Sequence, residues 1–196
     1  MPSSATRHLG NPRGPIQGLA FPPSYRPDAV LVGTWSWQAL ADDITGISNT
    51  GPGAAAWPIA NLAIAYPFEL TDYFPCRKVW WVNGATVGTD SADVGVFTEA
   101  GARLVSGGGT LIAGASIVQE VDVTDTLLTP GRYWCAMSVS GTTATPQRWQ
   151  PSVGQARAMG VAQMATAYPL PSTFTPAALA STAVPLCGIA SRTLVA

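Results

Sequence analysis

Residues able to act as nucleophiles, bases or soft metal ligands are scarce in this chain, whose only histidine is His8 and whose cysteines are Cys76, Cys135 and Cys187. A serine or cysteine nucleophile needs an imidazole beside it, and His8 lies in a proline- and glycine-rich N-terminal arm. A zinc site needs three or four converging ligands, and these residues show neither CxxC nor HxxxH spacing. We therefore expect neither a catalytic triad nor a metal or cofactor site.

Carboxylates are more numerous, and a pair of them at a fixed separation could hydrolyse glycosides. Most of the candidates fall at expected turns or on an expected solvent-facing strand, where hydration and turn capping explain them. Two of them could bind calcium, but no DxDxDG loop surrounds them. The candidates are Glu69, Asp90, Asp93, Glu99, Glu120 and the possible calcium ligands Asp122 and Asp125.

Glycine-rich and aromatic stretches offer two weaker binding motifs. Residues 107–109 are three glycines, but no lysine follows and no helix is expected to begin there, so we expect a loop rather than a phosphate cradle. Trp80, Trp81, Trp134 and Trp149 could stack on sugar rings, although core or interface packing is the commoner role of tryptophan. Trp80 and Trp81 are adjacent, so in a strand they point to opposite faces.

The composition indicates one domain with little charged surface. The chain has 196 residues, of which 47% are hydrophobic, enough to fill one core. Its 20 glycines and 17 prolines disfavour long helices and favour short strands with tight turns. Charged residues make up 11%, against about a quarter in a typical soluble domain. We infer that partners cover part of the surface.

Charge and hydropathy argue against nucleic acid and membrane insertion. The net charge is −1 and Lys78 is the only lysine, so no basic stripe is available for phosphates. The most apolar stretch, Ala54–Phe68, contains two prolines and is too short to cross about 30 Å of hydrocarbon. The first residues lack the apolar core of a secretory signal, so we expect folding in the cytoplasm, with reduced, buried cysteines.

Residues 1–61 are expected to form an extended arm. They contain eight prolines, seven glycines and six charges, and sustain no regular hydrophobic period. Ordering each residue costs about 1 to 2 kcal/mol, so the arm needs anchors. Folding back on its own domain is the alternative to docking on other subunits. Aromatic side chains are the anchors we expect at interfaces, in the arm and in the domain: Phe21, Tyr25, Trp35, Trp37, Trp57, Trp81 and Trp149.

Residues 62–196 are predicted to form an antiparallel β-sandwich or jelly roll. Alternating apolar residues predict strands over 61–70, 73–82 and 117–123, a hairpin over 93–106 and a strand after Thr129-Pro130-Gly131 that points Tyr133, Cys135, Met137 and Val139 inward. Asn83-Gly84 is a turn signal.

The last part of the domain, residues 151–196, has two charged residues, Arg157 and Arg192, and repeated proline-containing elements. We expect extended chain that adds strands and subunit contacts. Gln155–Ala167 is the one stretch that could be helical, although Gly160 and Thr166 leave this open.

Several segments occur in an order found in one family. They are NLAIAYPFEL, the hairpin within VWWVNGATVGTDSADVGVFTEAGARLVS, the L-x-P-G-x-Y element Leu128–Tyr133 and the late AYPLP and VPLCGIA. Over about residues 60–190 the chain resembles the jelly-roll domains of tailed-bacteriophage virion proteins. The resemblance implies a tail-fibre, tail-tip or capsid-decoration subunit, commonly a homotrimer, with no catalytic residues.

These observations lead to three hypotheses. The first is a phage virion structural protein, assembled in the host cytoplasm, whose arm docks on other virion proteins while the sandwich projects and contacts host surface glycans. The second is a carbohydrate-binding module that is not attached to a virion. The third is a small polysaccharide-degrading enzyme, which would need two converging carboxylates.

Overall fold

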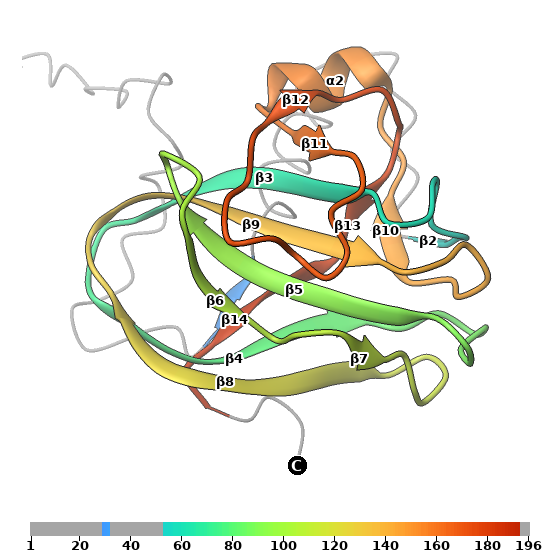
Figure 1. Ribbon diagram of the computed structural model, residues 1–196, viewed down its shortest axis with the longest axis horizontal. Coiled ribbons are helices and arrows are strands. Elements are labelled where there is room, and N and C mark those ends of the chain that lie inside the picture. Colours follow the sequence, from blue (N-terminus) through green and yellow to red (C-terminus); the bar gives the residue numbers. More distant parts are fainter. Residues whose placement is uncertain (1–28, 32–52, 193–196) are drawn as a thin grey trace, which may run out of the picture.

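The computed structural model describes residues 29–31 and 53–192, and these form an antiparallel β-sandwich (Figure 1). The elements are β1 (Ala29–Leu31), β2 (Gly53–Ala54), β3 (Ala63–Leu70), β4 (Phe74–Val82), β5 (Ser91–Thr98), β6 (Arg103–Ser106), β7 (Thr110–Leu111), β8 (Val118–Leu128), β9 (Gly131–Val139), β10 (Gln147–Trp149), α2 (Val153–Ala158), β11 (Ala162–Met164), β12 (Ala177–Ala178), β13 (Val184–Pro185) and β14 (Cys187–Ala190).

Two sheets face each other across the core. The small sheet has the order β1-β14-β4-β8, and the large sheet has the order β12-β11-β3-β9-β5-β6, with β7 also paired to β5. A short third sheet, β13-β10-β2, joins three distant parts of the chain. All the described pairings are antiparallel, so the expected all-β sandwich class is confirmed.

The core between the sheets follows the strand alternation of the sequence. Tyr133, Cys135, Met137 and Val139 of β9 all belong to it, as predicted, and so does Trp81 of β4. Each fully buried aliphatic or aromatic side chain of this kind contributes about 1.5 to 3 kcal/mol relative to an exposed one. The predicted hairpin is also confirmed, because β5 and β6 pair around the turn Glu99–Gly101.

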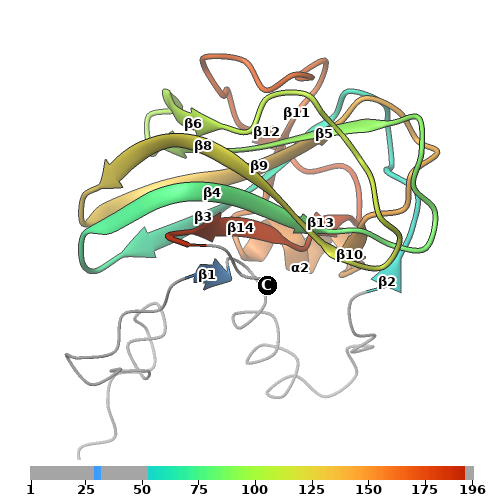
Figure 2. The same cartoon turned by 90° about the horizontal axis from the view of Figure 1, so that it is seen from below.

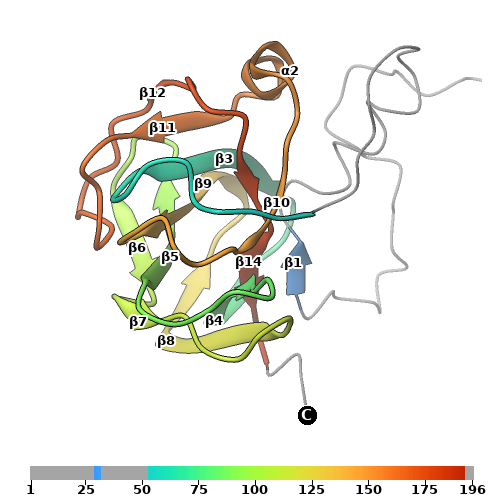
Figure 3. The same ribbon diagram turned by 90° about the vertical axis from the view of Figure 1, so that its right-hand side faces the viewer.

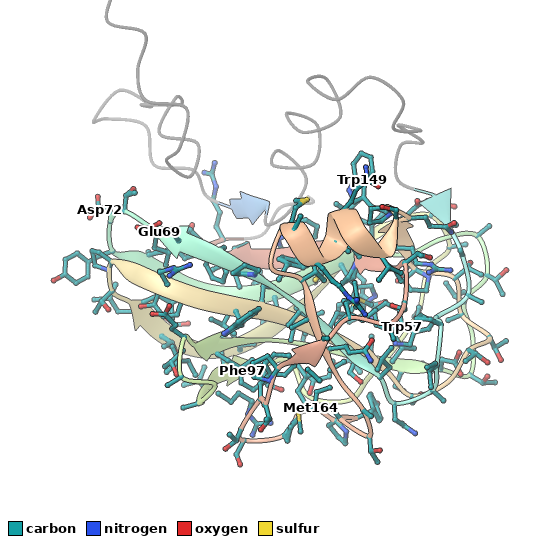
Figure 4. All side chains as sticks on the ribbon, turned by 90° about the horizontal axis from the view of Figure 1, so that it is seen from above. Trp57, Glu69, Asp72, Phe97, Trp149 and Met164 are labelled. Carbon is teal, nitrogen blue, oxygen red and sulfur yellow. The ribbon has the colours of Figure 1, made fainter. Side chains whose placement is uncertain are left out.

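A second apolar cluster lies on the other face of the large sheet. There Phe97, Leu170 and Phe174 pack with alanines, and Met164 lies against them (Figure 4). The sheet residues on this face are small because a covering segment, residues 162–174, approaches closely. Gly95 illustrates the closeness: a Cβ there would lie 2.6 Å from the Val105 carbonyl oxygen and 3.1 Å from Leu170 Cδ1. Figure 1 shows α2, β11 and β12 on the far side of β3 from β4 and β8.

β4 ends at Val82, where the Asn83-Gly84 signal predicted the strand to end, but no tight turn leads from it to β5. The two strands belong to different sheets. The side chain of Asn83 is buried, accepts the indole N–H of Trp81 at 2.7 Å and donates to the carbonyls of Ala113 and Gly114 at 2.7 and 2.9 Å. The residue therefore fixes a crossing between the sheets, for which a buried amide is useful and a tight turn is not.

The sequence left open whether 155–167 is helical, and the structure has a helix over only the first part of this stretch. The helix α2 begins earlier and ends at Ala158, and β11 follows it. Its start is set by a capping box, in which Ser152 accepts from the Gln155 N–H at 3.2 Å and the Gln155 side chain accepts from the Ser152 N–H at 2.7 Å. Gly160, with φ of +77°, follows the end of the helix.

The domain also includes residues that the sequence assigned to the arm. β2 pairs with β10, and Trp57 is 1% exposed within the main core, where its indole N–H donates to the Leu62 carbonyl at 2.8 Å. The sandwich therefore includes residues 53–61.

Replacing Gly101 with alanine is expected to destabilise the domain by about 2 to 4 kcal/mol. Gly101 has φ of +89°, which costs an L-residue about 1 to 2 kcal/mol, and a Cβ there would clash with the Phe174 carbonyl oxygen. Gly108→Ala is the matched control, because Gly108 has φ of +68° but open space around its Cβ position. Urea denaturation should show the larger loss for Gly101→Ala, and equal losses would mean that the clash is relieved by movement of residues 162–174.

Candidate binding surfaces

The N-terminal arm contacts the domain through β1. Ala29, Val30 and Leu31 pair in register with Ala190, Ile189 and Gly188 of β14. The opposite edge of β14 pairs with β4, from Cys187↔Trp81 to Ala190↔Lys78. Figures 2 and 3 show β1 beside β14 at the margin of the sandwich. A strand edge that is not paired exposes unsatisfied N–H and C=O groups, so β1 completes the small sheet.

The face of the small sheet that points away from the core carries Trp80. Trp81 belongs to the main core and Trp80 does not, which confirms that the two neighbouring indoles point to opposite faces. Trp80 is nevertheless only 4% exposed, and its N–H donates to the Ile189 carbonyl at 3.3 Å. Its cross-strand partner is Gly188, which has no side chain and leaves room for the indole.

A polar cleft lies at the other edge of the small sheet, where β8 approaches β6 of the large sheet. Its volume is about 400 Å³. The large sheet contributes β6, the small sheet contributes Thr124 of β8, and the glycine loop after β6 forms one wall. The residues that line it are Asp93, Arg103, Leu104, Val105, Ser106, Gly108, Gly109, Thr124 and Pro169.

Asp93 forms the polar floor of this cleft and is 0% exposed. Its carboxylate accepts the Ser106 hydroxyl at 2.8 and 2.9 Å and the Leu170 N–H at 2.9 Å. Arg103 donates through Nη1 to the Leu170 carbonyl. Burial raises the pKa of the Asp93 carboxyl, while the hydrogen bonds from Ser106 and Leu170 and the charge of Arg103 oppose the rise.

The hydrogen bonds of Asp93 show what it does in the fold. They tie β5 to β6 and to the covering segment that carries Leu170. The same segment is held again by the Arg103 N–H to the Ser172 carbonyl and by the Phe174 N–H to the Gly101 carbonyl, at 2.9 and 2.7 Å. The cleft is thus a rigid polar surface, and Arg103 and Thr124 leave further donors facing it.

Most of the other acids considered for catalysis or calcium binding are engaged elsewhere. Asp90 accepts the backbone N–H groups of Thr143 and Ala144, both at 2.7 Å. Asp122 pairs with Lys78 at 2.5 Å, Asp125 with Arg77 at 3.3 Å and Glu99 with Arg132 at 3.1 Å. Glu120 lies 3.9 Å from Lys78, and Glu69 is exposed near the end of β3 (Figure 4). Over residues 29–31 and 53–192, no group of three or more His, Cys, Asp or Glu side chains is arranged to hold a metal ion.

The three cysteines are buried and unpaired, as the sequence predicted. Tyr66 lies among them, and its hydroxyl donates to the Cys187 carbonyl at 2.8 Å and lies 3.0 Å from Cys187 Sγ. Burial raises the pKa of the Cys76 thiol to about 12, and the pKa of Cys135 is raised by its hydrogen bond with Cys187 and by burial. Thiols of this kind stay protonated, so they act as core residues.

The predicted interface residues are distributed in three ways. Four of them, Phe21, Tyr25, Trp35 and Trp37, lie outside the described residues. Trp57 and Trp81 are 1% and 0% exposed in the core rather than on a surface. The indole N–H of Trp81 is satisfied inside the domain by Asn83. Trp149 remains, half-buried on β10 beside α2 (Figure 4).

Exposed apolar side chains that were not singled out in the sequence stand out in the structure. Tyr73 and Leu127 are 53% and 62% exposed, and both lie where β4 and β8 run together. The others are Ile59, Leu104, Leu111 and Ile117. Leu104, Leu111 and Leu127 lie in strands, where alternation alone does not distinguish the solvent-facing phase from the core phase, and the other three lie outside strands.

Asp93→Asn is expected to destabilise the domain by about 1 to 3 kcal/mol, because one of the two acceptor oxygens is replaced by an NH₂ group that cannot accept from Ser106. The loss should depend on pH. The pKa of the Asp93 carboxyl is higher in the folded state than its unfolded value near 3.8. This carboxyl therefore adds to the stability of wild type below pH 3.8, and the added stability is lost as pH rises through the folded pKa. Urea denaturation of both proteins from pH 3.5 to 7 should therefore show that the difference in their free energies of unfolding becomes smaller as pH rises. A difference that stays constant would contradict the raised pKa.

Within residues 29–31 and 53–192, no helix has the length and apolar character needed to cross a membrane. Comparisons of the chain with protein-family models, with curated proteins and with solved structures found no match.

Proposed function

We propose that this chain is a non-catalytic structural subunit of a tailed-phage virion, in which the N-terminal arm docks on neighbouring subunits and the sandwich forms an appendage or decoration. One observation carries the assembly part of this proposal: the β14 edge accepts a strand of the arm. Here that strand is β1 of the same chain, which is the fold-back contact that the sequence left as the alternative to docking, and a strand from a neighbouring copy has the same backbone groups to offer. Strand addition to a sheet edge is a general means by which extended segments bind folded domains.

Three further features support the proposal. The low charge of the chain, 11%, suits a molecule whose surface is covered by neighbours. The L-x-P-G-x-Y element, on which the resemblance to virion proteins rests, forms the crossing from β8 to β9, where the Tyr133 hydroxyl donates to the Thr129 carbonyl at 2.7 Å. The buried carboxylates of Asp90 and Asp93 serve as acceptors that fix loops, which favours a structural over a catalytic role.

Deleting residues 1–52 tests the proposal. The truncated domain keeps Trp57 and β2 and should retain the circular dichroism of a β protein. In sedimentation velocity the full-length chain should form larger species, and the truncated domain should not. Deleting residues 1–57 is the contrasting cut, because loss of the buried Trp57 indole is expected to cost about 3 to 5 kcal/mol. A full-length chain that stays monomeric at several hundred micromolar would overturn the proposed assembly role.

A carbohydrate-binding module is the second candidate, and the cleft around Asp93 and Arg103 is the observation that favours it. The Arg103 guanidinium and the Thr124 hydroxyl around about 400 Å³ suit a sugar with several hydroxyls, and the buried Asp93 carboxylate fixes the wall behind them. On a glycan array, the domain without residues 1–52 should then bind, and Arg103→Ala should weaken binding by about tenfold or more. Binding that survives this change would place any glycan contact elsewhere, and an empty array would remove the candidate.

A further inference from the structure

We infer that β14 is an acceptor for the β1 strand of a neighbouring copy, so that subunits are linked by exchange of their arms. This inference rests on the proposed assembly role and adds to it the partner, the acceptor edge and the register. The contact that β1 makes with its own domain is the template: Ala29↔Ala190, Val30↔Ile189 and Leu31↔Gly188.

The acceptor edge fits an apolar, uncharged strand. All four residues of β14, Cys187–Ala190, are buried and none carries a charge. β4 pairs with one side of β14, so the backbone N–H and C=O groups on its other side are open to pairing with a strand. Any copy of Ala29-Val30-Leu31 presents the same backbone groups, so the strand of another subunit satisfies β14 as well as the strand of its own chain does.

The other long edge of the small sheet is less suitable for pairing between copies. β8 carries Glu120, Asp122 and Asp125, and two such strands placed side by side would bring carboxylates together. Lys78 and Arg77 of the adjacent β4 are already paired with these acids. Charge therefore favours the β14 edge for contacts with a second copy.

The chain is long enough for exchange. Residues 32–52 connect β1 to β2, and about 21 residues span up to about 70 Å when extended. A domain of about 140 residues has a radius of gyration of about 14 Å and hence a diameter of about 40 Å. The linker therefore reaches β14 of its own domain or of a domain packed next to it.

Exchange also links arm docking to assembly. A ladder of three residues is short, so a free strand in dilute solution is held weakly. When subunits are adjacent, the arm of a neighbour is present at an effective concentration comparable to that of the chain's own arm. The same pairs then form between subunits, and each exchange adds a tether between copies.

Cysteine pairs placed in register test this inference. One full-length chain carries Ala29→Cys, and a second, mass-tagged chain carries Ala190→Cys. The two chains are unfolded together and refolded, and the mixture is then concentrated and treated with oxidised glutathione. A covalent dimer of one tagged and one untagged chain is expected. The native thiols are buried and stay unreactive. Val30→Cys with Ile189→Cys is a second in-register pair, in case Ala190→Cys disturbs folding.

The controls separate this inference from the proposed function. Leu31→Cys mixed with Ala190→Cys is out of register by two residues and should give at least about fivefold less dimer. If the double variant Ala29→Cys, Ala190→Cys cross-links only within one chain while sedimentation shows an assembled protein, exchange is wrong and assembly stands. If that variant forms no cross-link at all, the register itself is wrong. A monomeric full-length chain would overturn both proposals.

Discussion

Close approach of a covering segment to the outer face of the large sheet is the constraint on which much of this structure depends. That face is built from alanine, glycine and serine where β3, β9 and β5 run side by side, for example Ala65↔Ala136↔Gly95. Larger side chains would keep residues 162–174 away and expose the second apolar cluster around Phe97 and Phe174. The large sheet is therefore buried on both faces, although only one of them meets the other sheet.

The same constraint explains why a carboxylate is buried in a β-sheet. Asp93 lies on the covered face, where the segment that crosses it has backbone donors and needs acceptors. A buried carboxylate with three hydrogen bonds replaces the pairing that an additional strand would have supplied. The cleft beside Asp93 exists because the covering segment and β8 do not close completely over β6 and the glycine loop.

The small sheet has a different relation to its surroundings. Its core face is apolar and continuous, while its far face combines Trp80, the ion pairs of Lys78 and Arg77 and the exposed Tyr73 and Leu127. One of its margins is completed by a strand from the arm. The small sheet thus has one edge completed by β1 and another, β8, that carries acidic side chains.

The sequence by itself determined the β-sandwich class, the hairpin over β5 and β6, the inward phase of β9 and the burial of the cysteines, because these depend on local alternation and turn chemistry. Tertiary structure alone decided the role of Asn83, since the same Asn-Gly pair serves in a turn or as a buried amide, depending on which strands meet. It also decided the place of Trp57, the burial of Asp93 and the pairing of β1 with β14. Each of these results from contacts between residues far apart in the chain, for which a single sequence carries no local signal.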